Sequence, residues 1–332
     1  MTRGPEVAIV GAGLMGGWHA RYAAAAGAKI SAIVDRQTPA AARLARSFPG
    51  AAVFGDLAEC LRRTSLEAVH ICSSTDAHPS HVDAALSAGK HVLVEKPLAS
   101  SAGDVERLLD QARSNGRILA AVHQFPFQRG ARRLEKDIGR LGELVRCEFV
   151  LCSAGGRGLD EEGRRRMLLE MLPHPVSLVR SLFGRAGGAD PEWQTPRFTS
   201  DELALTADGG AASFEVFLSL RGRPTRCELT ATGTRATASL DLFHGFCWID
   251  AAEPSRAAKA AAPFRRGTKL LSTAAGNLAR RALASQPAYP GLPELIGAFY
   301  RAAAEQGPSP VSREEILACA RLADRLKEKV EG

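Results

Sequence analysis

The fold of the first part of the chain is decided by one stretch, Val7-Ala8-Ile9-Val10-Gly11-Ala12-Gly13-Leu14-Met15-Gly16. Its four leading apolar residues predict a short buried strand, and the alanine-rich run at residues 14–26 predicts a helix directly after it. Gly11 permits the tight turn between the two, Gly13 lets a ligand approach the backbone, and Gly16 lets the helix pack closely on the strand. The free N–H groups at the start of the helix attract phosphate. The stretch therefore predicts a site for the pyrophosphate of a dinucleotide.

A second predicted strand, residues 29–34, leads into an acid, Asp35. It lies roughly 20 residues after the last glycine, where dinucleotide-binding folds place the carboxylate that accepts the ribose hydroxyls of NAD and repels the 2′-phosphate of NADP. Arg36 beside it can hold that phosphate, so NADP stays open as an alternative to the expected NAD. The residues that this motif places along the cofactor are Gly11, Gly13, Leu14, Met15, Gly16, Asp35 and Arg36.

Short apolar strands and helices alternate as far as residue 123. The predicted strands are 7–10, 29–34, 51–54, 68–72, 91–95 and 118–122, and the predicted helices between them are 14–26, 39–46, 57–63, 81–87 and 102–114. Continuous apolar strands that alternate with helices are typical of a parallel sheet covered on both faces. Residues 1–123 are therefore expected to form an α/β Rossmann domain with a doubly wound parallel sheet.

The pattern changes in residues 124–332, which we expect to form an α+β domain with a large open, mostly antiparallel sheet. The predicted strands are 144–151, 203–207, 212–220, 225–231, 236–241 and 245–250, and the predicted helices are 163–183, 292–304 and 312–329, with helix and loop around 256–288. Ser312, with Glu315 three residues on, is the expected cap of the last helix. An open sheet face favours burial against a second copy of the chain, hence a homodimer or homotetramer.

The composition excludes several classes of protein. The 332 residues are 45% hydrophobic and 24% charged, which is ordinary for a soluble globular protein of two domains. No run approaches about 18 apolar residues, so no membrane span is predicted. Seven cysteines without a CxxC pair indicate reduced thiols in the cytoplasm. The other prominent histidines (His19, His70, His81, His91 and His244) lack paired ligand spacing, so we predict no metal site.

The formal net charge of +7 is concentrated in residues 253–286, where one acid, Glu253, faces seven bases. These bases are Arg256, Lys259, Arg265, Arg266, Lys269, Arg280 and Arg281. The rest of the chain is nearly balanced, which argues against a nucleic-acid binder. The basic segment is interpreted first as a solvated helical face. A phosphate-bearing substrate and an acidic membrane surface are the alternatives.

Two further runs carry a resemblance to a known family. They are Ser73-Ser74-Thr75-Asp76-Ala77-His78 and Ala88-Gly89-Lys90-His91-Val92-Leu93-Val94-Glu95-Lys96-Pro97-Leu98-Ala99. With the glycine motif, they resemble the Gfo/Idh/MocA family of glucose–fructose oxidoreductases and inositol dehydrogenases. The likeness is strong in the N-terminal half and looser beyond it. It implies an NAD(H)-dependent oxidoreductase that transfers hydride between nicotinamide and a secondary alcohol or ketone carbon of a sugar, cyclitol or nucleotide-linked sugar.

The resemblance also implies roles for individual residues. Those placed along the nicotinamide half of the cofactor are Ser73, Ser74, Thr75 and His78, with Glu95 at its ribose. Lys96 would reach both cofactor and substrate; by itself, a lysine at a strand end is more often a surface residue. Residues 168–174 resemble the family's Leu-x-Asp-x-Gly-x-His stretch, which assigns catalysis to Lys96, Glu170 and His174. His174 would accept the hydroxyl proton, Lys96 would lower the pKa of that hydroxyl, and Glu170 would orient the group or balance its charge.

This stretch departs from the family in two ways. Glu170 replaces an aspartate, and His174 stands between Pro173 and Pro175. Because a residue before proline is biased away from the helical region, we expect Leu172 and His174 to be extended and Pro175 to begin a helix that His174 caps. Purely structural roles, a cap for His174 and an ordinary carboxylate for Glu170, are the alternatives.

Further candidates follow the sixth predicted strand. The family often has an arginine near Phe127, whereas this chain has Pro126, so we expect His123 to contact substrate and Gln124 to contact the cofactor. An equally supported interpretation is that His123 is a hydrogen-bonded residue of the hinge. Arg157, with Arg164, Arg165 and Arg166, lies in a charged loop that is either solvated or a lid on an anionic substrate.

Two other functions stay open. One is oxidation by tightly held NAD, followed by elimination of a glycosidic substituent and reduction. The other is a non-catalytic dinucleotide-binding scaffold or redox sensor, for which the proline pair and the aspartate-to-glutamate change are the evidence.

Overall fold

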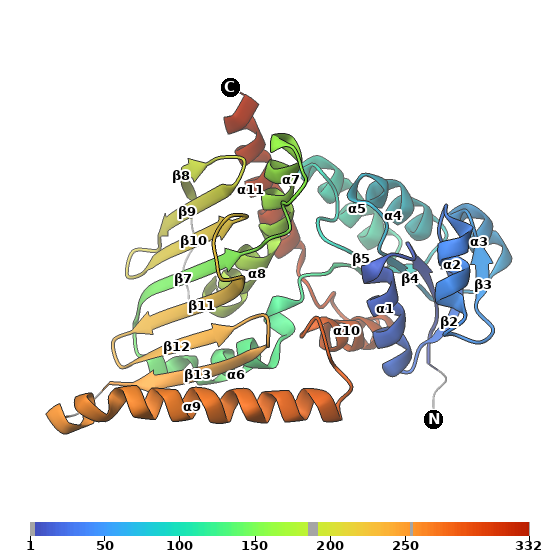
Figure 1. Cartoon of the computed structure of the whole chain (residues 1–332). Coiled ribbons are helices and arrows are strands. Elements are labelled where there is room, and N and C mark those ends of the chain that lie inside the picture. The colour runs from blue at the N-terminus through green and yellow to red at the C-terminus, as the bar shows by residue number, and fades with distance from the viewer. Residues whose placement is uncertain (1–3, 185–191, 253–254, 332) are drawn as a thin grey trace. The chain divides into compact units, whose positions relative to one another are not determined.

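The computed structural model describes residues 4–184, 192–252 and 255–331 (Figure 1). The chain forms two compact units, Met1–His123 with Leu292–Gly332, and Gln124–Gly291. The expected boundary after residue 123 coincides with this division, but the expected second domain, 124–332, is too long. Helices α10 (Leu292–Glu305) and α11 (Arg313–Glu331) return to the first unit, where α10 packs on α1 and α11 on α5. In the described part of the chain, no helix combines the length and apolarity of a membrane span.

The first unit is built on a six-stranded parallel sheet in the order β3-β2-β1-β4-β5-β6. Its strands are β1 (Glu6–Val10), β2 (Lys29–Val34), β3 (Ala52–Phe54), β4 (Ala68–Ile71), β5 (His91–Val94) and β6 (Leu119–Ala121). Its other helices are α1 (Leu14–Ala25), α2 (Thr38–Ala45), α3 (Leu57–Arg63), α4 (His78–Ser87) and α5 (Ala102–Ser114), with the 3-10 turn η1 (Thr75–Ala77). This confirms the predicted doubly wound Rossmann sheet.

Side-chain caps explain why several helices begin where the sequence predicts. Asp56 accepts a hydrogen bond from the Glu59 N–H, Ser101 from that of Asp104, and Ser312 from that of Glu315. The last of these is the predicted cap of α11. Helix α4 begins three residues earlier than predicted, at His78, because a proline in its first turn costs the helix no hydrogen bond.

The second unit is built on a seven-stranded sheet in the order β13-β12-β11-β7-β10-β9-β8. Its strands are β7 (Leu144–Cys152), β8 (Gln194–Phe198), β9 (Glu202–Asp208), β10 (Ser213–Ser219), β11 (Arg226–Gly233), β12 (Ala236–Asp241) and β13 (Phe246–Ala251). Only the β7–β10 pair is parallel among the described strand pairs. The predicted large, mostly antiparallel sheet is therefore confirmed.

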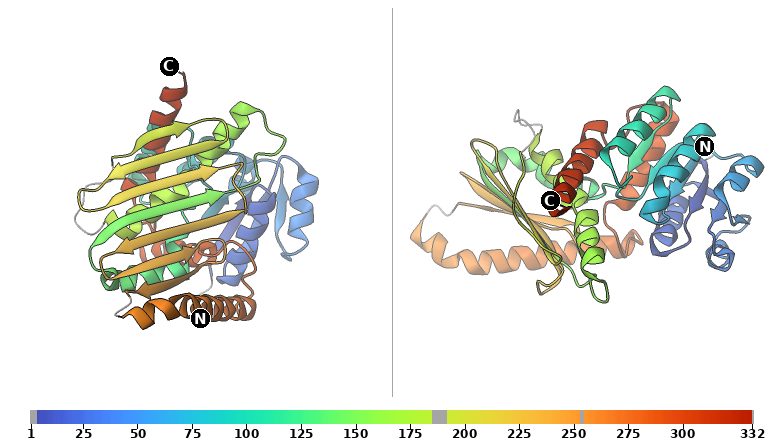
Figure 2. Two further views of the ribbon diagram at one scale, coloured as in Figure 1. Left: turned by 60° about the vertical axis from the view of Figure 1, so that its left-hand side comes forward. Right: turned by 90° about the horizontal axis from the view of Figure 1, so that it is seen from above.

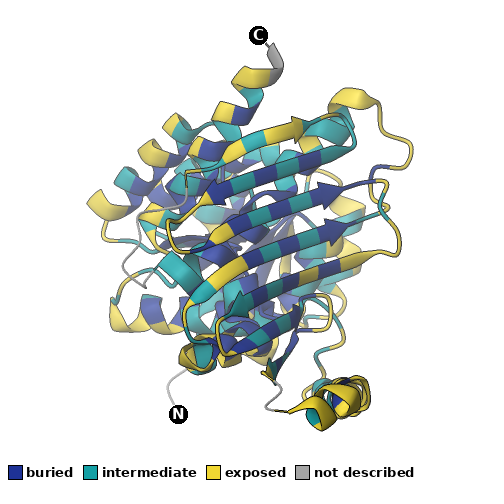
Figure 3. Cartoon of the chain, turned by 90° about the vertical axis from the view of Figure 1, so that its left-hand side faces the viewer, coloured by how far each residue is buried: buried dark blue, intermediate teal, exposed yellow. Residues whose placement is uncertain are grey.

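Helices cover one face of this sheet and leave the other open (Figures 2 and 3). The helices of the unit are α6 (Arg129–Asp137), α7 (Glu161–Met171), α8 (Pro173–Phe183) and α9 (Arg256–Leu283), with the 3-10 turns η2 (Phe125–Phe127) and η3 (Ile138–Leu141). Residues in β7 alternate between the two faces: Cys147 and Phe149 are buried toward the helices, while Arg146 and Glu148 point to the open face. Helix α9 instead runs along the edge strand β13.

Candidate functional site

The carboxyl ends of the parallel strands bring the predicted cofactor residues to one edge of the first sheet. Its strand order reverses direction between β1 and β4, the point where open α/β sheets bind ligands. Gly11 has φ +96°, and a Cβ there would lie 2.5 Å from the carbonyl oxygen of Cys72 at the end of β4. A Cβ on Gly16 would lie 1.8 Å from the carbonyl oxygen of Gly11. Both glycines are therefore required by close backbone packing.

Gly13 differs from these two because open space surrounds it. A Cβ there would meet no atom within 4 Å, and no side chain caps the N-terminus of α1 at this residue. The first N–H groups of α1 thus face outward beside a residue that has no side chain. Leu14, the first residue of the helix, is also exposed, with 70% of its surface accessible. Met15 lies half-buried next to it. This cradle fits the pyrophosphate of a dinucleotide.

Asp35 is held beside the glycine loop by two backbone hydrogen bonds. The Ala12 N–H donates to its Oδ2 at 2.8 Å, and the Gln37 N–H donates to its Oδ1 at 2.8 Å. A carboxylate oxygen accepts more than one hydrogen bond, so both oxygens can still receive ribose hydroxyls. Arg36 is exposed at the same edge. The arrangement fits NAD, and it leaves a cation available for a 2′-phosphate.

The residues after β4 divide into surface and interior positions. Ser74 is exposed, Thr75 is half-buried in η1, and the hydroxyl of Ser73 lies 3.0 Å from Nδ1 of His81. His78 is buried: its Nδ1 lies 2.8 Å from the carbonyl oxygen of Pro97, and its Nε2 lies 3.0 Å from that of Ser73. His78 thus ties the loop after β4 to the loop after β5.

The end of β5 carries a buried carboxylate next to the candidate catalytic lysine. Lys96 is half-buried, and its backbone N–H donates to Oε2 of Glu95 at 3.2 Å. Oε1 of Glu95 lies 3.2 Å from Nε2 of His19, and Nδ1 of His19 lies 3.0 Å from Nδ1 of His70. Nε2 of His70 lies 2.8 Å from the hydroxyl of Tyr300 on α10. These contacts form one buried chain, which we call the histidine relay (His19, His70, Glu95 and Tyr300).

The acceptor chemistry of the relay fixes the direction of its hydrogen bonds. An ionised Glu95 only accepts, so Nε2 of His19 donates to it. With both rings neutral, Nδ1 of His19 then accepts from Nδ1 of His70, and Nε2 of His70 accepts from the Tyr300 hydroxyl. Every polar atom along the chain is satisfied in this arrangement, and every donor points toward the carboxylate beside Lys96.

Burial and neighbouring groups support the protonation states of His70, Tyr300 and Glu95. Burial, then electrostatic repulsion from the His19 side chain, holds the pKa of His70 well below its ordinary value. Burial also raises the pKa of Tyr300, which therefore keeps its proton. Burial alone would raise the pKa of Glu95, but the hydrogen bond from His19 and the neighbouring charges, Lys96 among them, lower it. Glu95 is thus ionised near neutral pH.

In the second unit, Glu170 and His174 lie on two consecutive helices. Leu172 joins them with φ −57° and ψ −37°, so the expectation that Leu172 is extended is wrong. The expected start of the helix at Pro175 is also wrong, because α8 begins at Pro173 and contains His174 in its first turn. The missing N–H groups of both prolines fall where a new helix needs no internal bond, which removes the cost of continuing in helical geometry.

The ring of His174 is fixed by an aromatic neighbour from η2. It stacks on Phe125 with ring centroids 4.3 Å apart and an angle of 12° between the planes. The hydroxyl of Ser177, one turn on in α8, donates to the carbonyl oxygen of His174 at 3.2 Å. Glu170 is half-buried on α7. This unit therefore offers a half-buried imidazole in a defined plane, with a carboxylate one helical turn before it.

The remaining candidates lie in differing surroundings. His123, in the first unit, is buried, and its Nδ1 lies 2.8 Å from Oε1 of Glu315 on α11, which favours the hinge reading over a substrate contact. Gln124, in the second unit, is buried against Gly291, where a Cβ would lie 2.2 Å from its carbonyl oxygen. Arg157 is exposed in the loop between β7 and α7.

Two arginines of the same loop region are already paired. Arg164 Nε lies 2.9 Å from Oδ1 of Asp201, and Arg165 Nη2 lies 3.1 Å from Oε2 of Glu161. These ion pairs occupy two of the four arginines. This favours a solvated charged loop over a lid that binds an anionic substrate.

Comparison with known proteins gives one family and several relatives. Residues 6–123 match the sequence profile of an oxidoreductase family with an NAD-binding Rossmann fold. An inositol 2-dehydrogenase of Pseudomonas savastanoi pv. phaseolicola is 28% identical, covering 68% of this chain and 71% of its own. A dTDP-3,4-didehydro-2,6-dideoxy-alpha-D-glucose 3-reductase of Streptomyces violaceoruber is 38% identical over 49% of each chain. A levoglucosan dehydrogenase, solved with NADH and levoglucosan, shares the fold with a TM-score of 0.76 at 16% identity, covering 98% of this chain and 96% of that one.

The glycine loop allows a paired test of packing against cofactor binding. We expect Gly16→Ala to lower the free energy of unfolding by about 1–3 kcal/mol or more, because its methyl group overlaps the Gly11 carbonyl. We expect Gly13→Ala to keep the parent's melting temperature but to weaken NADH binding roughly tenfold, because its methyl group occupies the approach of the pyrophosphate. Thermal unfolding and NADH fluorescence titration measure the two effects. Parent-like NADH binding by Gly13→Ala would refute the cradle.

The buried His70 gives a test by pH. Its folded-state pKa is depressed, so between that value and the ordinary pKa the unfolded chain binds a proton that the folded chain refuses. The stability contributed by neutral His70 is therefore complete above about pH 6.5 and falls by up to about 1.4 kcal/mol for each pH unit below it.

Urea unfolding at pH 7.5 and 5.5 tests this. Between these two pH values, the free energy of unfolding should fall less in His70→Gln than in the parent. His81 and His91, whose pKa values burial also lowers, stay in both proteins and cancel from the comparison. Equal losses would contradict a neutral His70.

Proposed function

We propose that this chain is an NAD(H)-dependent oxidoreductase of the Gfo/Idh/MocA family, whose model its first unit matches over residues 6–123. In this proposal, Lys96, His174 and Glu170 catalyse the oxidation and reduction of a sugar or cyclitol hydroxyl. One observation carries the assignment of Lys96: it follows β5 at the edge that also holds the glycine cradle and Asp35. A cation at that edge lies where an open α/β sheet presents its ligand.

When bound, NAD supplies a nicotinamide carbon that accepts or gives up hydride. Lys96 provides the positive charge that stabilises a developing alkoxide on the substrate oxygen. Glu95, ionised and anchored by the histidine relay, keeps a negative charge next to Lys96. The relay therefore acts on the catalytic group through Glu95.

His174 takes the hydroxyl proton in this proposal. Imidazole suits that role because its ordinary pKa lies near neutral pH, and stacking on Phe125 keeps the ring in one plane. Glu170, one helical turn before it, balances the charge that His174 gains. The substitution of glutamate for aspartate lengthens this side chain by one methylene, and the helical geometry at Leu172 keeps the two residues on neighbouring turns.

The substrate belongs to the class of polyhydroxylated rings. Relatives that carry the same kind of first unit are named for inositol and for a dTDP-linked deoxysugar, so both free and nucleotide-linked rings are candidates. NAD is the proposed cofactor, because Asp35 is held beside the glycine loop, where dinucleotide-binding folds carry the carboxylate for the ribose. A relative named for NADP, the scyllo-inositol 2-dehydrogenase IolU of Bacillus subtilis, is consistent with the alternative that Arg36 leaves open.

We also propose a reducing, cytoplasmic compartment. All seven cysteines are free, and six of them are buried. Burial raises the pKa of Cys147 and of Cys227, so these thiols stay protonated and unreactive at neutral pH. Fractionation of the source cells with an antibody tests the location, and a purely extracellular signal would reject it.

The open sheet face supports a homo-oligomer. It carries Val150 opposite Phe217, together with Arg146, which bonds Glu148 and Glu215 at 2.8 Å each. An apolar pair beside a mixed-charge network is typical of a surface that meets a second copy. We expect a dimer or tetramer by light scattering, and we expect Phe217→Arg to shift it toward monomer. A monomeric parent protein would reject this proposal.

A turnover screen tests the catalytic assignment. With NAD⁺ or NADH and a panel of inositols, free sugars and nucleotide-linked sugars, we expect Lys96→Met to reduce kcat roughly 100-fold or more while NADH still binds. Lys90→Met, the same change on the loop before β5, is the matched control and should retain the parent's kcat. Equal kcat in the two variants would overturn the role of Lys96. Product formed without net NADH would identify the oxidation–elimination reaction, and firm NADH binding without hydride exchange would identify a sensor.

A further inference from the structure

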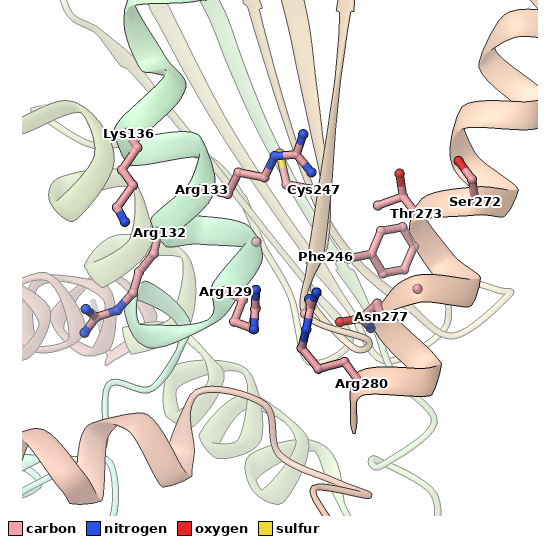
Figure 4. Close-up of a pocket in the computed structure, with 13 residues that line it drawn as sticks. Arg129, Arg132, Arg133, Lys136, Phe246, Cys247, Ser272, Thr273, Asn277 and Arg280 are labelled. Atoms are coloured by element: carbon pink, nitrogen blue, oxygen red, sulfur yellow. The ribbon is translucent and has the colours of Figure 1, made fainter. Parts of the chain in front are cut away.

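A basic groove lies between α6 and α9 in the second unit (Figure 4). It has a volume of about 600 Å³, and its floor is the start of β13 at Phe246 and Cys247. Four cations from α6 and one from α9 line it: Arg129, Arg132, Arg133, Lys136 and Arg280. Arg129 and Arg280 enter the gap from its two opposite sides.

No acid of the described residues lines this groove, and few of its cations are neutralised elsewhere. Within the described chain, Arg129, Lys136 and Arg280 have no ion pair within 4.0 Å. Arg133 Nε lies 3.8 Å from Asp137 Oδ2, and Arg132 lies over the ring of Phe127. Burial raises the pKa of Cys247 to about 11, so its thiol adds no negative charge.

The sequence of α9 deepens this imbalance. Residues 256–283 contain seven basic residues and no acid, so this helix carries an excess equal to the formal net charge of the whole chain. The acid of the basic segment, Glu253, lies outside the described residues. The helix and loop expected around 256–288 are confirmed: a single helix with a Ser255 cap runs from Arg256 to Leu283, and residues 284–288 follow it without helical structure. A solvated face alone does not require that Arg280 of this helix meet the cations of α6.

The walls of the groove are fixed, so its cations are held near one another. A Cβ on Gly130 would lie 2.7 Å from the backbone of Phe246, which seats α6 directly on β13. Asn277 and Arg281 of α9 both donate to the carbonyl oxygen of His244, at 2.8 and 3.1 Å. Like charges held together in this way repel one another, and a bound anion removes that cost.

We infer that this groove is a binding site for a phosphoanion, with Arg129 and Arg280 as its principal ligands. Guanidinium groups bind phosphate oxygens in bidentate fashion, and two of them on facing walls suit a diphosphate better than a single small anion. The volume lies in the range of small-molecule sites and leaves room for a group attached to the phosphates. This site belongs to the second unit, whereas the glycine cradle belongs to the first, and its test requires no turnover.

The diphosphate chemistry has two sources. One is a soluble nucleotide-linked compound. The other is the headgroup of an anionic lipid, since α9 also exposes Phe264, Leu271 and Leu278 at seven-residue spacing, with 78%, 72% and 70% of their surfaces accessible.

Calorimetric titration of inorganic pyrophosphate tests the site on protein saturated with NAD⁺, which blocks the glycine cradle. We expect the double variant Arg129→Gln/Arg280→Gln to weaken pyrophosphate binding roughly tenfold or more. Arg256→Gln/Lys259→Gln removes the same charge from the exposed start of α9 and should change the affinity less than about threefold. Equal losses in both variants, or no binding by the parent, would overturn the site. A melting temperature equal to the parent's shows that each variant is folded, and unchanged NADH affinity keeps this result separate from the proposed catalysis.

Two further measurements complete the test. A crystal of the parent protein soaked in tungstate should place the anion between Arg129 and Arg280, and an anion bound only elsewhere would overturn the site even if the double variant failed to fold. Competition of UDP with pyrophosphate would support the site and identify the soluble source. Arg129- and Arg280-dependent binding to phosphatidylcholine vesicles that contain phosphatidylglycerol, absent without it, would support the site and identify the lipid source.

Discussion

The first unit depends on one buried chain of hydrogen bonds that ends on a carboxylate. Tyr300, His70, His19 and Glu95 come from α10, β4, α1 and the end of β5, so a single network joins the sheet to two helices that pack on each other. An unsatisfied polar group at any point would cost about 1–3 kcal/mol, which makes the network intolerant of partial assembly. The same chain sets the charge beside Lys96. In the proposed mechanism, structural completion and catalytic readiness are thus one condition in this unit.

The two units differ in how their polar and charged side chains are neutralised. In the first, histidines and a tyrosine satisfy each other in the interior without a net positive charge. In the second, α6 and α9 bring five cations to a groove beside β13 whose lining includes no acid among the described residues. The first pattern is what stability favours, since it leaves no orphan group. The second opposes stability in the isolated chain, and the proposed binding of an anion would remove that cost.

Local sequence predicts elements well where hydrophobic periodicity and capping agree. Residues 57–63, 102–114 and 236–241 have the predicted bounds, because apolar spacing and turn residues specify the same limits there. Strand β8 was not predicted because its sequence, Gln-Thr-Pro-Arg-Phe, is polar and contains a proline, and α6 because it is mostly charged. The glycine cradle and Asp35 are local features and were predictable. The histidine relay was not, since its partners lie 51, 76 and 230 positions apart, although two histidines in apolar segments were a signal that buried partners exist.

The second unit interrupts the first in the chain, and this has a consequence for biosynthesis. A ribosome completes every strand of the parallel sheet before residue 124, but α10 and α11 emerge only after the inserted unit. At ordinary translation rates this delay is on the order of ten to thirty seconds. During it, the apolar surface that Phe299 later covers stays exposed and the hydroxyl that His70 requires has not yet been made. The inserted unit is therefore fully synthesised before the first unit can complete its core.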